Sequence, residues 1–121
     1  MHLLIVDDDN DCAETLKAFL LLSGHEVRVA RDVSTALGLI DQSVPEATII
    51  DIGLPETDGY ELARRLRSRP DLSRMALIAY SGWSRARDQA AGIEAGFDHY
   101  VTKPADPVVF NGILSQLART R

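Results

Sequence analysis

Five short apolar runs alternate with segments that have the period of an amphipathic helix, and this alternation constrains the fold more than any other feature of the sequence. Runs this short are typical of strands, because helices of globular proteins are usually longer. The first and third runs are apolar on both faces, as central parallel strands are, whereas the second alternates with charged residues. The predicted strands span residues 3–6, 26–30, 47–50, 76–80 and 99–102.

The segments after the runs carry apolar stripes at helical spacing. The helix after the fourth run has only Ala90, Ile93 and small side chains to bury, so we expect it to be the most loosely held. Gly24 and Gly96 have the positions of helix C-caps, and Asp32 has that of an N-cap. The other stripes consist of Leu16, Phe19 and Leu20; Val33, Ala36, Leu37 and Ile40; Leu62 and Leu66; and Val109, Ile113 and Leu117.

Together, the runs and stripes predict an α/β fold: a (βα)5 chain wound doubly about a five-stranded parallel sheet, as in flavodoxin. The 121 residues, 45% of them hydrophobic, suit a single domain over residues 1–121. A net charge of −5 argues against a nucleic-acid-binding surface. The one cysteine, Cys12, permits no internal disulfide, and no signal sequence or membrane-length apolar run is present. We therefore expect a cytoplasmic protein without membrane insertion.

Charged and polar residues follow four of the five predicted strands. Ligands of a doubly wound sheet bind beyond the carboxyl ends of the strands, so we expect these residues to converge on one site. An ionised carboxylate such as Asp51, at the end of an apolar strand, is costly unless a cation or hydrogen-bond donors meet it there. The residues are Asp7, Asp8 and Asp9 after the first strand, Asp51 after the third, Ser81 after the fourth, and Lys103 and Pro104 after the fifth.

This set of side chains predicts a chemistry. Clustered carboxylates repel one another and bind protons unless a divalent cation lies among them, and ligation by oxygen alone suits Mg²⁺. A magnesium site beside a free carboxylate, a lysine and a hydroxyl is suited to place a phosphoryl group on an aspartate nucleophile. Positioning and charge neutralisation supply most of the catalysis in such a transfer.

The motifs around these residues resemble the receiver domain of bacterial two-component response regulators. The resemblance covers essentially the whole chain and rests on LLIVDDD, DIGLPETDGYE, AYSG and AGFDHYVTKP, in the order and spacing of that family. It implies a signalling domain, not otherwise an enzyme, that catalyses its own phosphorylation and dephosphorylation. The implied phosphodonor is a phosphohistidine on a histidine kinase or a histidine phosphotransfer domain.

The resemblance also implies a role for individual residues. Asp51 would be the phosphoacceptor. Mg²⁺ would be held by Asp8, Asp51 and the backbone carbonyl of Gly53, with Asp7 contributing through water.

A second group of implied roles concerns the switch. Ser81 would be the hydroxyl that follows the phosphoryl group, Lys103 would pair with a phosphoryl oxygen, and the peptide bond before Pro104 would be cis. Tyr100 would rotate and report the switch on the surface formed by the fourth helix, fifth strand and fifth helix, where a downstream protein binds.

The motifs are most like those of receivers at the C-terminal end of hybrid sensor histidine kinases, which implies that the chain is one module of a longer protein. A stand-alone receiver without an output domain is the alternative. Ser81 replaces the more frequent Thr, which leaves the hydroxyl less restricted. Gly53 has no side chain to orient a water, and Trp83 is a large aromatic at the rim of the site. We therefore expect slow loss of the phosphoryl group, and faster loss after Trp83→Ala.

Two other protein classes have a related sheet. An aspartyl-nucleophile phosphatase of the haloacid dehalogenase type needs an acid two residues after its nucleophile, and Gly53 holds that position, so this hydrolase is the less favoured alternative. A flavin-binding electron carrier needs a phosphate loop after the first strand, where the aspartates would repel the phosphate. Asp9 and Asp11 are interpreted as solvated or helix-capping acids, and Cys12 as a packing residue.

Overall fold

The structure is a computed structural model that describes residues 1–54, 58–82 and 86–119. Strands and helices alternate as the sequence predicts, and the bounds of the strands differ from the predicted ones by at most one residue. The elements are β1 (His2–Val6), α1 (Asn10–Leu22), β2 (Glu26–Ala30), α2 (Val33–Gln42), β3 (Ala47–Asp51), α3 (Gly59–Arg67), the 3-10 helix η1 (Pro70–Leu72), β4 (Ala76–Ser81), α4 (Ala86–Ala95), β5 (His99–Thr102) and α5 (Val108–Arg119).

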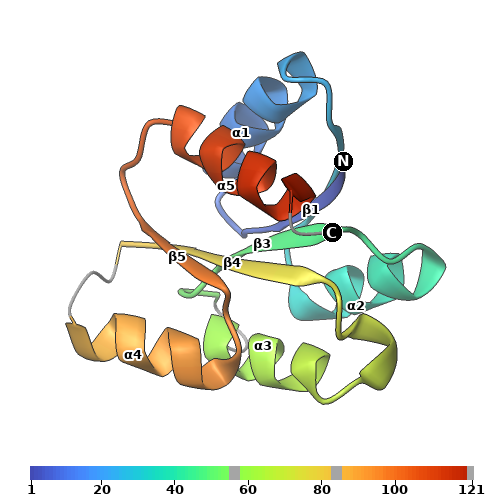
Figure 1. The fold of residues 1–121 in the computed structure, drawn as a ribbon, viewed down its shortest axis with the longest axis vertical. Helices are drawn as coiled ribbons and strands as arrows, with labels where there is room; N and C mark the ends of the chain where they lie inside the picture. Colours follow the sequence, from blue (N-terminus) through green and yellow to red (C-terminus); the bar gives the residue numbers. More distant parts are fainter. Residues whose placement is uncertain (55–57, 83–85, 120–121) are drawn as a thin grey trace.

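The strands form one parallel sheet in the order β2-β1-β3-β4-β5. Helices α1 and α5 cover one face, and α2, α3 and α4 cover the other (Figure 1). The direction of winding reverses between β1 and β3, which are neighbours in the sheet although α1, β2 and α2 separate them along the chain. The predicted doubly wound fold is confirmed, and its ligand crevice is expected beside the carboxyl ends of β1 and β3.

Each face of the sheet has its own apolar core. Leu3, Ile5 and Ile49 belong to the cluster under α1 and α5, and Leu4 and Ile50 belong to the cluster on the other face. β1 and β3 are therefore buried on both sides, as predicted, whereas the edge strand β2 is only partly buried. Because each fully buried Leu or Ile contributes about 1.5 to 3 kcal/mol, these central strands are a firm base for the residues that follow them.

Aspartates cap the first three helices, and glycines follow α1 and α4. Gly24 and Gly96 have φ angles of +92° and +111°, a backbone region that side chains rarely adopt. Both predicted C-caps and the predicted N-cap Asp32 are confirmed, as is the helix-capping interpretation of Asp9. The capping carboxylates are those of Asp9, Asp32 and Asp58, which accept from the backbone N–H of Cys12, Thr35 and Glu61 at 3.1, 2.7 and 2.9 Å.

The buried face of α5 differs from the predicted one. Phe110 and Leu114 are fully buried, Ile113 and Leu117 are partly buried beside them, and Val109 is 42% exposed. The prediction for Val109 was wrong because two apolar stripes overlap on this helix. The stripe that contains Phe110 buries the larger side chain and therefore more apolar surface.

The buried face of α4 also differs. Ala90 is exposed and Ile93 is 73% exposed, so the prediction that they are buried was wrong. Gly92 and Ala95 face the protein instead. A Cβ at Gly92 would lie 2.9 Å from Cδ2 of Tyr100, so the helix can approach this ring closely only through a residue without a side chain. The expectation that α4 is loosely held stays a prediction.

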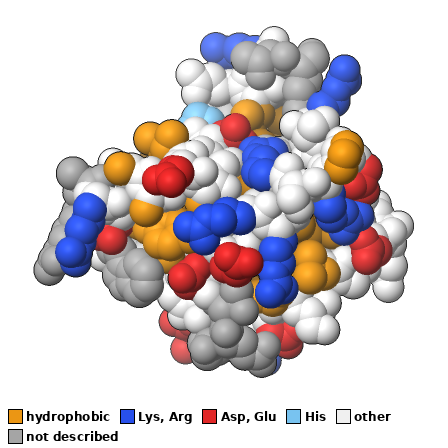
Figure 2. All heavy atoms as spheres, turned by 90° about the horizontal axis from the view of Figure 1, so that it is seen from below, with side chains coloured by type: hydrophobic (Ala, Val, Ile, Leu, Met, Phe, Trp, Pro, Cys, Tyr) orange, Lys and Arg blue, Asp and Glu red, His pale blue; other side chains and the backbone are white. Residues whose placement is uncertain are grey.

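Charged side chains are frequent on the side of the molecule that carries α3 and α4. Figure 2 views the molecule from below, and basic and acidic side chains lie there among scattered hydrophobic ones. On α3, Arg64 and Arg65 pair with Glu61 at 3.4 and 3.6 Å. Within the ranges that the structure describes, no helix combines the length and the apolar character needed to cross a membrane.

Candidate functional site

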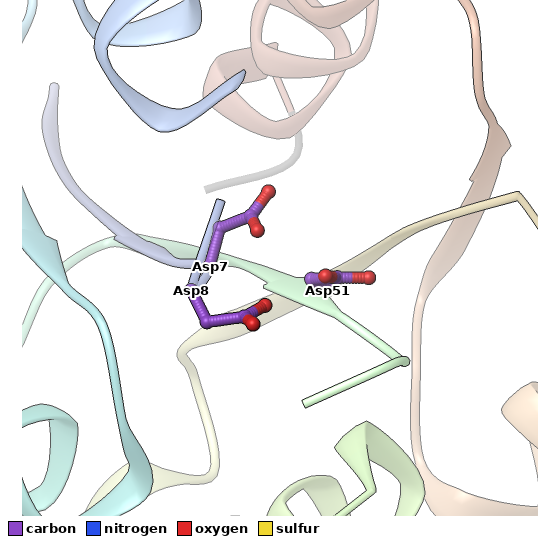
Figure 3. A group of neighbouring side chains, drawn as sticks. All are labelled: Asp7, Asp8 and Asp51. Atoms are coloured by element: carbon purple, nitrogen blue, oxygen red, sulfur yellow. The ribbon is translucent and has the colours of Figure 1, made fainter. Parts of the chain in front are cut away.

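Three carboxylates converge at the carboxyl ends of two neighbouring strands. Asp7 and Asp8 follow β1, and Asp51 is the last residue of β3 (Figure 3). One oxygen from each carboxylate lies within 4.8 Å of the other two. The register explains this arrangement, because Val6 lies beside Ile50 and the residues that follow both emerge at the same level. The structure thus brings together the three acids that the sequence singles out.

Lys103 reaches the same place from beyond β5. Its Nζ donates to Oδ2 of Asp7 at 3.1 Å and lies 3.8 Å from Oδ1 of Asp51. Burial alone would lower the pKa of this ammonium, but the charges of Asp7 and Asp51 outweigh the burial, and its pKa is raised. A positive charge therefore stays beside the acids at neutral pH.

Asp51 has a pKa raised above that of an ordinary aspartate. Burial is the largest cause, and repulsion by Asp7 acts in the same direction. The backbone N–H of Gly53, which donates to Oδ1 of Asp51 at 3.1 Å, and the ammonium of Lys103 act in the opposite direction. Three clustered acids, Asp7, Asp8 and Asp51, thus stand against one lysine that contacts two of them, so among these four residues negative charge is in surplus.

The donor atoms of this group fit Mg²⁺. The three acids offer oxygen ligands only, as hard cations prefer, and their surplus charge is of the sign that a divalent cation neutralises. Asp8 is exposed, which leaves space for the waters that Mg²⁺ usually retains. Gly53, whose carbonyl the resemblance adds to this set, is an exposed residue two positions beyond Asp51.

Backbone contacts hold the ends of β1 and β3 in place. Oδ1 of Asp7 accepts from the N–H of Asp9 at 2.9 Å, which joins the buried acid to the residue that caps α1. After β3, the N–H of Gly59 donates to the carbonyl of Ile52 at 2.9 Å. A Cβ at Gly59 would lie 2.8 Å from Cα of Ile52 and 2.9 Å from the carbonyl oxygen of Asp51, so this close return of the chain requires glycine.

The remaining predicted residues lie on β4 and β5. Ser81 is the last residue of β4 and is buried, and its carbonyl accepts from the N–H of Lys103 at 2.7 Å. The peptide bond between Lys103 and Pro104 is cis, as the resemblance implies. Tyr100 packs with the core cluster under α4, on the face of the sheet opposite Val101.

Two residues near the acids played no part in the predicted site. Tyr80 has its ring centroid 4.9 Å from Nζ of Lys103, and the register of β3 and β4 places it beside Asp51. The pairing of Tyr80 with Asp51 across β3 and β4 is the observation that places Tyr80 at the site. Cys12 interacts with Asp7 and Lys103, and burial raises the pKa of its thiol, as expected of a packing residue. Trp83 lies outside the described residues, so the expectation about it stays a prediction.

Comparison with known proteins gives the family of this chain. Residues 3–114 match the model of the response regulator receiver domain. The chain is 35% identical over 104 residues to the response regulator MprA of Mycobacterium sp. (strain KMS), an alignment that covers 86% of this chain and 44% of MprA. The chain therefore spans less than half of the length of that relative.

Solved structures agree with the sequence match. A response regulator from Chloroflexus aurantiacus is 35% identical, with a TM-score of 0.90 and coverage of 96% of this chain and 95% of that one. The receiver domain of a signal transduction histidine kinase from Syntrophus aciditrophicus is 34% identical, with a TM-score of 0.88 and coverage of 96% and 88%. The chain belongs to the family of response regulator receiver domains, which are signalling domains of two-component systems.

Proposed function

We propose that this receiver is switched by transfer of a phosphoryl group to Asp51 from a phosphohistidine of a histidine kinase or a histidine phosphotransfer domain. The observation that carries the proposal is the convergence of Asp7, Asp8, Asp51 and Lys103 beyond β1, β3 and β5. A structural cluster needs no surplus of like charge, whereas an anion-accepting site that binds a cation does. Membership of the receiver family supports the same function.

The transfer replaces one bond to phosphorus by another. An oxygen of Asp51 forms the new bond while the bond from phosphorus to the histidine nitrogen breaks, and the imidazole keeps the electron pair of that bond and takes up a proton. Asp51 must be ionised to attack. The N–H of Gly53 and the ammonium of Lys103 favour this ionised form against the effect of burial.

The charges around Asp51 divide the remaining tasks. Asp8, Asp51 and the backbone carbonyl of Gly53 would hold Mg²⁺, with Asp7 contributing through water, and the ion would supply positive charge to neutralise phosphoryl oxygens. Lys103 supplies a second positive charge on the side of β5. Asp7 orients this ammonium through the 3.1 Å hydrogen bond, so the lysine is held near the site before any phosphodonor arrives.

The proposal extends to the switch. The hydroxyl of Ser81 follows the phosphoryl group, and Tyr100 passes this movement to the surface of α4, β5 and α5. Three hydrophobic side chains on those helices support a protein-binding surface there, because Ile93, Val108 and Val109 are 73%, 56% and 42% exposed. The downstream partner is therefore proposed to be a protein, and direct binding of nucleic acid or insertion into a membrane is not part of the function.

The cellular setting completes the proposal. We infer a cytoplasmic receiver in which residues 1–121 act as one domain, either as a module of a hybrid sensor histidine kinase or as a stand-alone receiver. Similarity to the receiver of the Syntrophus histidine kinase supports the first arrangement.

Phosphorylation by a small phosphodonor tests the proposal. Incubation with acetyl phosphate and Mg²⁺ should add the mass of one phosphoryl group, EDTA should prevent this, and Asp51→Asn should abolish it. Asp11→Asn is the matched control, because Asp11 is an exposed acid in the first turn of α1 and should leave the labelling unchanged. Labelling of Asp51→Asn at the wild-type level would contradict the assignment.

A further inference from the structure

Tyr80 lies on β4, the strand between the phosphoacceptor strand β3 and the strand β5 that precedes Lys103. The register pairs Tyr80 with Asp51 on β3 and with Val101 on β5, and paired residues of a parallel sheet project from the same face. Nζ of Lys103 lies 4.9 Å from the centroid of this ring, within the range of a cation–π contact. The neighbours of the ammonium thus include the face of an aromatic ring besides the carboxylates of Asp7 and Asp51.

Phe110 of α5 holds this ring in place. The two rings are 5.0 Å apart at an angle of 80°, the edge-to-face arrangement that aromatic pairs prefer. Phe110 is fully buried. The orientation of the ring beside Lys103 is thus fixed by the core under α1 and α5, and does not depend on the charges of the site.

A lysine needs such a support more than an arginine would. Its ammonium is a point charge on a flexible four-carbon stem, and it has no fixed geometry of its own. Carboxylates alone would draw it to Asp7, which at 3.1 Å is closer than Asp51 at 3.8 Å. An aromatic face attracts the cation without accepting its N–H groups in hydrogen bonds, so these donors remain available for phosphoryl oxygens.

We propose that Tyr80 is a positioning residue for phosphoryl transfer, whose ring holds the ammonium of Lys103 beside Asp51 where the oxygens of the phosphodonor arrive. This proposal rests on the proposed roles of Asp51 and Lys103. Tyr80 acts through the lysine and does not itself touch the phosphoryl group.

Kinetics of labelling by acetyl phosphate with Mg²⁺ test the proposal. Tyr80→Leu, which keeps an apolar side chain but removes the ring, should slow labelling about fivefold, the value of a partly desolvated cation–π contact. Tyr80→Phe keeps the ring and should stay within about twofold of wild type. Ile78→Leu, on the same strand and in the same core cluster, is the packing control and should leave the rate unchanged.

Two further measurements separate positioning from a general effect on structure. In a Lys103→Met background, Tyr80→Leu should have no further effect, because the residue through which it acts is absent. Equal slowing by Tyr80→Leu in the wild-type and Lys103→Met backgrounds would overturn the proposal.

The second measurement uses the metal-free protein. The ε-methylene protons of Lys103 should show an upfield ring-current shift by NMR in wild type and in Tyr80→Phe. Their appearance at the position of an unstructured lysine in wild type would overturn the proposal, whether or not Tyr80→Leu folds.

Failure of this inference and failure of the proposed function give different results. If Asp51 is not the phosphoacceptor, either wild type takes up no label or Asp51→Asn takes it up as wild type does. If the phosphoacceptor is correct but Tyr80 does not position Lys103, wild type and Tyr80→Leu take up label at the same rate.

Discussion

Charged side chains gather at both ends of the sheet, but the two groups are built differently. At the carboxyl ends of the strands, three acids cluster, two of them in contact with Lys103, and Asp51 has a raised pKa. At the amino ends of β4 and β5, Arg67 meets a single acid, Asp98, at 2.6 Å. In the first group the acids outnumber the lysine, whereas in the second Arg67 and Asp98 pair one to one.

The group at the amino ends also satisfies its hydrogen-bond donors. Arg67 donates through Nε to the carbonyl of Gly96 at 2.9 Å and through Nη1 to that of Met75 at 2.7 Å. The carboxylate of Asp98 accepts both from Arg67 and from the N–H of Leu77, the latter at 2.8 Å. These bonds tie the end of α3 to the turn after α4 and to the start of β4, so the group serves the fold.

The difference teaches how to tell a structural cluster from a functional one. Matched charges with satisfied donors stabilise the folded chain, whereas repelling charges are retained where a ligand is meant to relieve the repulsion. Variants at the two ends should therefore fail in opposite ways, one losing phosphorylation and the other losing stability.

The largest expected effect comes from Asp8→Ala. Labelling by acetyl phosphate should be lost, because Asp8 is an expected ligand of Mg²⁺, yet the free energy of unfolding in EDTA should be no lower than that of wild type, because repulsion among the acids is relieved. Urea denaturation in EDTA and the mass of the labelled protein measure the two effects. Marked destabilisation of the metal-free variant would instead show that Asp8 has a structural role.

Arg67→Met is the converse variant. It should lower the free energy of unfolding by about 2 kcal/mol, because it leaves Asp98 and two carbonyls without their donor, and labelling should continue at the wild-type rate. Arg64→Met is the matched control on the same helix. Its partner Glu61 and Arg64 itself are about half exposed, so its loss should cost about 0.5 kcal/mol or less. A large loss of labelling in Arg67→Met would break the distinction between the two ends.

A pair of glycines sharpens the comparison further. Gly59→Ala and Gly96→Ala should each lower the free energy of unfolding by about 1 to 2 kcal/mol, the first through contact with backbone atoms and the second through its positive φ and contact with the side chain of Arg67. Only Gly59→Ala should also slow labelling, because the added Cβ would push against the backbone carbonyl of Asp51 and so shift the phosphoacceptor. Equal labelling rates in both variants would show that the loop after β3 tolerates the shift.

The smallest expected effect is the pH dependence of Asp51→Asn in EDTA. Folding raises the pKa of Asp51, so the folded chain binds this proton more readily than the unfolded chain does. Stability of wild type should therefore fall as the pH rises from the ordinary aspartate pKa through the raised one. Asp51→Asn has no carboxyl group to titrate at this position, so its stability does not fall in this way. The difference in the free energy of unfolding between the variant and wild type should therefore be near zero in acid and reach a plateau above the raised pKa. Urea denaturation over a pH series measures it, and an advantage independent of pH would contradict the prediction.

Much of this molecule follows from local sequence patterns. The strands are short apolar runs, and the site residues are those that follow them, so both are visible without a structure. The buried faces of α4 and α5 could not be predicted from the sequence. Ile93 and Val109 lie on plausible helical stripes, and only the packing partner decides which of two neighbouring stripes is buried. Tyr80 was missed for a related reason, since its place beside Asp51 depends on a register between strands far apart in the chain.

The small residues on the inner face of α4 have a consequence for native-state hydrogen exchange. An opening that lifts a helix packed through Gly92 and Ala95 exposes little apolar surface, so its amides should exchange through a step that barely depends on denaturant. The amides of β3 should exchange only with global unfolding. One hydrogen bond that such an opening must break is the 2.9 Å bond from the hydroxyl of Tyr60 to the carbonyl of Asp88. Among the described helices, the first to become deuterated should then be α4, which lies against Tyr100.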